Sequence, residues 1–127
     1  MPATPLWGGL LALLYIALTV RVVRNRKRAQ VAIGHGRDAG LERAIRSHAN
    51  FAEYVPIALI LMLAAELLGA WLWLAHLAGA MLLTGRLVHA YGIVREASDL
   101  RLRPIGMGLT LASLGLLGIT NIVLAFR

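Results

Sequence analysis

Residues 41–68 read LERAIRSHANFAEYVPIALILMLAAELL. The second half of this stretch is continuously apolar, whereas the first half places arginine, asparagine and glutamate among apolar residues. A run in which leucine and alanine dominate, without strict alternation, favours a helix over a strand. Its length is close to the ~20 residues that a helix needs to cross a bilayer core. We therefore predict a membrane-spanning helix with a polar first half.

Three further apolar stretches flank this one, and the composition indicates the same class of protein. The chain has 127 residues, and 59% of them are hydrophobic, against roughly 45–50% in soluble domains. A soluble domain of this size could not bury so much apolar surface. We expect one transmembrane domain over residues 1–127, an all-α integral membrane four-helix bundle with helices at about 6–23, 43–68, 71–93 and 105–126.

The basic residues indicate how the chain is oriented in the membrane. The formal net charge is +7, and most lysines and arginines lie between the first two or the last two apolar stretches. Because cytoplasmic loops carry the excess of lysine and arginine, we expect both loops to be cytoplasmic and both termini to lie outside. The basic cluster at residues 24–28 then serves as a topology signal near anionic lipid, and we expect no nucleic-acid partner.

Polar side chains line one side of the helix expected at residues 43–68. At about 100° per residue, His48 lies on the other side, and one arc of about 100° holds Arg43, Arg46, Asn50, Glu53 and Tyr54. A charge at bilayer depth costs about 2.5–3.5 kcal/mol, so this stripe faces another helix, another subunit or a cavity. It is either a structural seam in which Arg46 and Glu53 neutralise each other, or a site for a small zwitterionic ligand.

The helix expected at residues 71–93 adds polar groups at overlapping depth. Arg86, His89 and Tyr91 lie near its cytoplasmic end, although the Arg86 side chain could instead snorkel to the headgroups. We expect no metal site. Glu66 is expected to reach the headgroups at the outer side, and Gly108 with Ala112 to form a close-packing face.

Residues 42–56, ERAIRSHANFAEYVP, resemble the hallmark segment of the MAPEG family, the membrane-associated proteins in eicosanoid and glutathione metabolism. Residues 85–92, GRLVHAYG, resemble the bacterial branch of that family. The resemblance implies a bacterial inner-membrane protein with periplasmic termini. It also implies a left-handed four-helix bundle that forms a homotrimer and binds glutathione between neighbouring subunits.

The resemblance also implies roles for individual residues. Four of them match family residues that hold glutathione, namely Arg46, Asn50, Glu53 and Tyr54, and His48 occupies a position near the ligand. We add Arg86, His89 and Tyr91 to the expected glutathione-binding set. The arginine that activates the glutathione thiol has two candidates, Arg21 and Arg101.

The implied function is that of a membrane-embedded glutathione transferase or peroxidase. Glutathione is the co-substrate, and a lipophilic electrophile or hydroperoxide arrives from the bilayer. A nearby guanidinium would stabilise the thiolate, which is the nucleophilic form. Two alternatives stay open: a non-catalytic protein that retains the MAPEG fold, and a small multidrug-type proton antiporter in which Glu53 is the membrane carboxylate.

Overall fold

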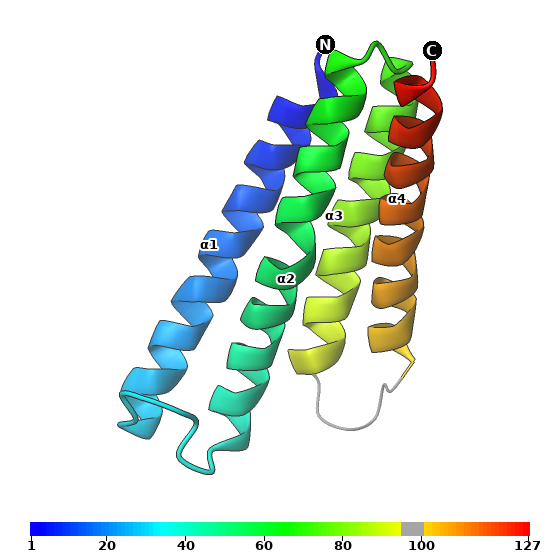
Figure 1. Cartoon of the computed structure of the whole chain (residues 1–127). Helices are drawn as coiled ribbons and strands as arrows, with labels where there is room; N and C mark the ends of the chain where they lie inside the picture. Colours follow the sequence, from blue (N-terminus) through cyan, green and yellow to red (C-terminus); the bar gives the residue numbers. More distant parts are fainter. Residues whose placement is uncertain (95–100) are drawn as a thin grey trace.

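The computed structural model describes residues 1–94 and 101–127, and its regular structure is entirely helical. The helices are α1 (Ala3–Ala29), α2 (Ala39–Leu67), α3 (Leu72–Val94) and α4 (Leu102–Ala125) (Figure 1). Each of the four is long and apolar enough to cross a membrane. The prediction of an all-α membrane bundle is therefore confirmed.

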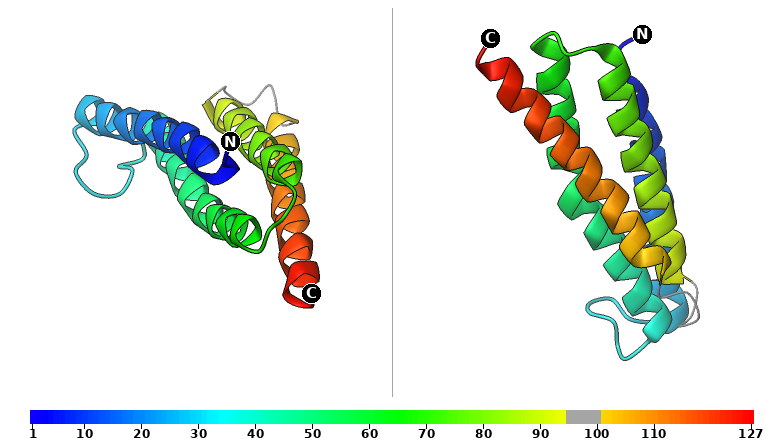
Figure 2. Two further views of the ribbon diagram at one scale, coloured as in Figure 1. Left: turned by 90° about the horizontal axis from the view of Figure 1, so that it is seen from above. Right: turned by 90° about the vertical axis from the view of Figure 1, so that its right-hand side faces the viewer.

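The helices run up and down beside one another. Both termini and the α2–α3 turn lie at one end of the bundle, which we call the terminal end (Figure 1). The α1–α2 loop, residues 30–38, lies at the opposite end, which we call the basic end. In the described part of the chain, every pair of helices packs together except α1 and α4, which lie on different sides of the bundle (Figure 2).

Helix α1 is longer than the apolar stretch that predicted it. It begins before Leu6 and continues past Val23 to Ala29, so the basic cluster forms its last turns. Arginine and lysine are favourable there, because the C-terminal end of a helix carries a partial negative charge. Gln30 ends the helix in the left-handed conformation, with φ of 55°. The basic cluster is thus helical instead of lying in a loop.

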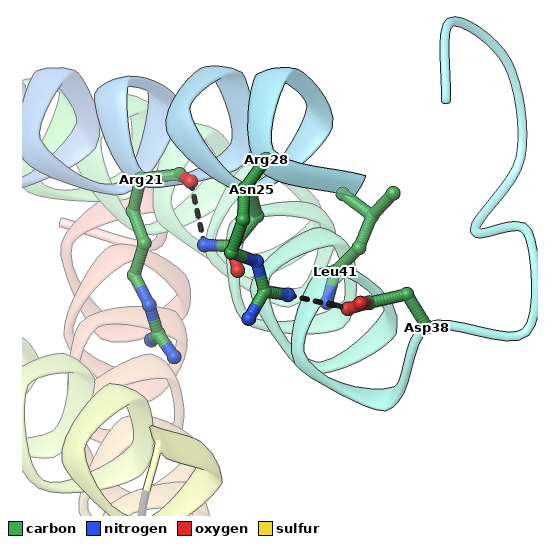
Figure 3. A network of polar contacts seen from close by, with 5 residues as sticks. All are labelled: Arg21, Asn25, Arg28, Asp38 and Leu41. Atoms are coloured by element: carbon green, nitrogen blue, oxygen red, sulfur yellow. Dashed lines mark hydrogen bonds and ion pairs between the residues drawn. The ribbon is translucent and has the colours of Figure 1, made fainter. Parts of the chain in front are cut away.

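Asp38 joins the end of α1 to the start of α2 (Figure 3). Its carboxylate accepts a hydrogen bond from the Leu41 amide at 2.7 Å and forms an ion pair with Arg28 at 2.7 Å. The Leu41 amide and the Arg28 guanidinium hold the pKa of this carboxyl below its ordinary value. Because a side-chain acceptor at this position satisfies an otherwise unpaired amide of the first turn, Asp38 fixes where α2 begins.

Helices α3 and α4 pack through glycines. A Cβ atom on Gly106 would lie 2.6 Å from the carbonyl oxygen of Gly85, so the two backbones meet at that level. The expected close-packing pair on α4 is not used inside the chain, because Gly108 and Ala112 are both exposed and a Cβ on Gly108 would meet nothing within 4 Å. The α3–α4 seam therefore uses the face that carries Gly106.

Glu66 has a different role from the one expected. Its carboxylate accepts hydrogen bonds from the backbone amides of Ala3 and Thr4, the latter at 3.0 Å. It therefore caps the N-terminus of α1 from a position on α2, instead of extending to the headgroups. His76 of α3 accepts a hydrogen bond from the Trp7 indole at 3.2 Å, which ties α1 to α3 at the same end.

Candidate functional site

Arg86 is the most buried charged side chain of the predicted site. It is 2% exposed and lies on α3 between α2 and α4. The guanidinium donates from Nη1 to Asn50 Oδ1 at 2.5 Å and from Nε to Thr110 Oγ1 at 2.9 Å. It also lies over the Tyr54 ring, 5.6 Å from the centroid. The alternative in which Arg86 snorkels to the headgroups is therefore wrong.

Asn50 and Tyr54 thus face the interior of the bundle, whereas two charged members of the same stripe do not. Arg46 and Glu53 are exposed on α2, and they form no ion pair with each other, although the structure describes both residues. The alternative of a structural seam, in which these two charges neutralise each other, is therefore not found within the single chain. The single chain leaves both charges open on the surface of a helix long enough to span the membrane.

His48 lies on another face of α2, against α1. Its ring stacks on Tyr15 with centroids 4.7 Å apart, and its Nε2 is 3.1 Å from the Thr19 hydroxyl. Tyr15 stacks in turn on Phe51 at 5.4 Å. The single chain therefore does not bring His48 together with Arg46 and Glu53.

The two arginines expected to activate a thiol differ in their surroundings. The Arg21 side chain extends from α1 toward α3 (Figure 3), is partly buried, and has an Nη1 atom that is buried without a hydrogen-bond partner. Arg101 is exposed at the start of α4, where its side chain makes no capping hydrogen bond. Arg21 is therefore the candidate with an unused buried donor.

The other two predicted site residues on α3, His89 and Tyr91, differ in burial. His89 is buried against α4. A Cβ atom added to Gly106 would lie 2.8 Å from the Cβ atom of His89. Tyr91 is exposed, although it has an interaction of its own. Among the described residues, no group of three or more histidines, cysteines or acidic residues could hold a metal ion.

Two residues that contact Arg86 were not predicted from the sequence. Both lie on α4: Thr110 accepts from Nε, and the Met107 sulfur lies 3.7 Å from Nη2. Thr110 is fully buried, and its hydroxyl also donates to the Gly106 carbonyl at 3.0 Å. The signal that could have found it is a hydroxyl in a mostly apolar membrane helix, although Thr110 shares this signal with Ser113 and Thr120 of the same helix.

Comparisons with known proteins agree with this architecture. A family model described as the MAPEG family matches residues 4–123. The inner membrane protein YecN of Escherichia coli strain K12 is 42% identical over 117 residues, which cover 92% of this chain and 88% of that relative. The protein of the same name from Escherichia coli O6:H1 matches to the same extent. The name of these relatives states a membrane location and no substrate.

Proposed function

Because this chain belongs to the MAPEG family of membrane proteins, we propose that it is a glutathione-dependent transferase or peroxidase that acts on lipophilic electrophiles or hydroperoxides. We place it in a bacterial inner membrane with both basic loops in the cytoplasm, in line with its relatives and with the distribution of arginine.

The observation that carries this proposal is the pair of exposed charges on α2. Arg46 and Glu53 are seven residues apart, or about 10 Å along the helix, and Asn50 lies between them. Glutathione carries two carboxylates, one ammonium and two peptide groups. Arg46 can hold a carboxylate through two hydrogen bonds, Glu53 can hold the ammonium, and Asn50 can bind an oxygen between them.

A second copy of the chain would complete this site. Glu53 lies near the middle of the 29-residue helix α2, where a charge that faces lipid is costly. His48 packs against α1, whereas Arg46 and Glu53 are exposed elsewhere on α2, so one ligand can contact His48 together with these two charges only where two copies meet. We therefore propose a homotrimer with glutathione between neighbouring subunits.

The chemistry follows from a positive charge near the thiol. A free thiol has a pKa of about 8.5, so it is mostly protonated at neutral pH. The buried Arg21 donor would stabilise the thiolate. With a substrate such as a halonitrobenzene, the thiolate forms a carbon–sulfur bond while the carbon–halogen bond breaks, and the halide leaves with the electron pair of that bond. With a hydroperoxide, the thiolate takes one oxygen and releases an alcohol, and a second glutathione converts the resulting sulfenic acid to a disulfide and water.

Turnover of two lipophilic substrates tests the catalytic part of the proposal. The detergent-purified protein would be given glutathione with either a halonitrobenzene or a lipid hydroperoxide. We expect Glu53→Gln to lower kcat/KM for glutathione at least about tenfold, because a charged hydrogen bond of about 1.5–3 kcal/mol is lost. Glu42→Gln, on the exposed first turn of α2, is the matched control and should keep full activity.

The outcomes separate the proposed enzyme from the non-catalytic alternative. Glutathione binding that depends on Glu53, without consumption of either substrate, would favour a non-catalytic protein of this fold. Equal activity in Glu53→Gln and Glu42→Gln would contradict the proposal that the exposed charges on α2 bind glutathione.

A further inference from the structure

We infer that Thr110 and Arg86 are positioning residues that fix the amide of Asn50, so that Asn50 turns its N–H donors, and not its oxygen, toward glutathione. This inference rests on the proposed function, and it assigns to Arg86 a role behind the ligand instead of contact with it. It also adds Thr110, which lies on a different helix from the charged stripe.

The orientation of the Asn50 amide follows from the chemistry of arginine. A guanidinium has five N–H donors and no acceptor, so the atom of Asn50 that lies 2.5 Å from Arg86 Nη1 is the oxygen Oδ1. The amide nitrogen therefore points away from Arg86. A flipped amide would set two donors against each other in the interior, which is costly for buried polar groups.

Arg86 is itself held in place from α4. Thr110 Oγ1 accepts from Arg86 Nε at 2.9 Å and spends its only hydrogen on the Gly106 carbonyl at 3.0 Å. The hydroxyl therefore presents a lone pair to Arg86 and cannot present its hydrogen. Because Thr110 is fully buried and Arg86 is 2% exposed, water does not readily replace either partner.

This chain of hydrogen bonds restricts what Asn50 can bind. Asn50 is half-buried and lies on α2 between the levels of Arg46 and Glu53. Because Oδ1 is directed at Arg86, the group that the side chain turns away from Arg86 is the Nδ2 amide, which donates. The ligand atom that pairs with Nδ2 is then a carboxylate or carbonyl oxygen of glutathione.

Variants of Asn50 test the orientation with and without ligand. Asn50→Asp keeps an oxygen for Arg86 but removes both N–H donors, whereas Asn50→Leu removes both the oxygen and the N–H donors. Without glutathione, we expect Asn50→Asp to melt at or above the wild-type temperature and Asn50→Leu to melt below it. With glutathione, we expect Asn50→Asp to raise Kd about tenfold or more, the loss expected for one good hydrogen bond.

Variants of Thr110 test the positioning role. Thr110→Val keeps the shape but removes the acceptor, and Thr110→Ser keeps the hydroxyl. We expect Thr110→Val to raise KM for glutathione about tenfold with kcat nearly unchanged, and Thr110→Ser to restore KM. A merely structural role would instead reduce the amount of active protein and leave KM unchanged.

The proposed function and the positioning role of Thr110 and Arg86 can be overturned separately. A wild-type protein that does not bind glutathione overturns the proposed function and this inference together. A wild-type protein that binds glutathione, with unchanged Kd in Asn50→Asp and unchanged KM in Thr110→Val, overturns this inference alone.

Discussion

At the scale of single residues, neutral groups surround the buried charge of Arg86. Arg86 forms no ion pair with a carboxylate in the described residues; its partners are an amide, a hydroxyl, a thioether and an aromatic ring. Neutral acceptors satisfy the donors while leaving the positive charge uncompensated. Such a site favours an anionic ligand nearby, which agrees with a tripeptide that carries two carboxylates.

Glu66 gives a prediction at the same scale. The Glu66→Gln variant keeps one oxygen acceptor but loses the negative charge that faces the amides of Ala3 and Thr4. A hydrogen bond to a charged group contributes about 1.5–3 kcal/mol, so we expect a melting temperature several degrees lower. Glu42→Gln, which caps no other helix, should melt like the wild type; equal melting of both variants would contradict the capping role.

At the scale of helices, the sequence predicted what depends on composition and missed what depends on neighbours. Hydropathy located all four helices, because each apolar stretch matches the thickness of a bilayer. It could not place the end of α1, because hydropathy falls at Arg24 while the backbone stays helical to Ala29. It also could not separate a snorkelling Arg86 from a buried one, because Thr110 and Asn50 come from other helices.

The α3–α4 seam gives a prediction at this scale, with its control on the same helix. A Cβ at Gly106 would lie 2.6 Å from the Gly85 oxygen and 2.6 Å from the His89 nitrogen, and backbone atoms cannot move aside easily. Overpacking of this kind costs about 1–3 kcal/mol, so Gly106→Ala should melt well below the wild type. A Cβ at Gly108 would have open space around it, so Gly108→Ala should melt close to the wild type. If Gly108→Ala melted below Gly106→Ala, the placement of the α3–α4 contact on the Gly106 face would be contradicted.

The start of α2 gives a prediction of pH dependence. The pKa of Asp38 is lowered in the folded chain, so its contribution to stability is present above the ordinary aspartate pKa of about 3.9. That contribution is lost as the pH falls through the folded pKa. Asp38→Asn keeps an N-cap acceptor without the charge. Melting curves at pH 7 should place the wild type above Asp38→Asn, with a gap that narrows from roughly pH 5 downward; a constant gap would contradict this account.

At the scale of the whole molecule, the predicted site residues on α2 divide among three faces of that helix. Resemblance alone could assign residues to a ligand, but a sequence does not say which of them one chain can bring together. Asn50 and Tyr54 meet Arg86 in the interior, Arg46 and Glu53 lie open, and His48 packs on α1. This division is what a site shared by two subunits would require.

The orientation of the whole chain is testable because the sequence contains no cysteine. Ile33→Cys lies in the α1–α2 loop at 91% exposure, and Phe126→Cys lies at the terminal end at 90% exposure. If the basic loops are cytoplasmic, a membrane-impermeant maleimide added to intact spheroplasts should label Phe126→Cys and not Ile33→Cys. The opposite labelling pattern would invert the proposed topology.

The central claim is that the charged stripe on α2 binds glutathione, and thermal melting of the purified protein tests it most directly. A ligand at 100 times its Kd adds about 2.7 kcal/mol to the free energy of unfolding. We predict that millimolar glutathione raises the melting temperature of the wild type and of Glu42→Gln, and leaves Arg46→Ala and Glu53→Gln unchanged. A wild type that does not shift, or a shift that survives in both stripe variants, would contradict the claim.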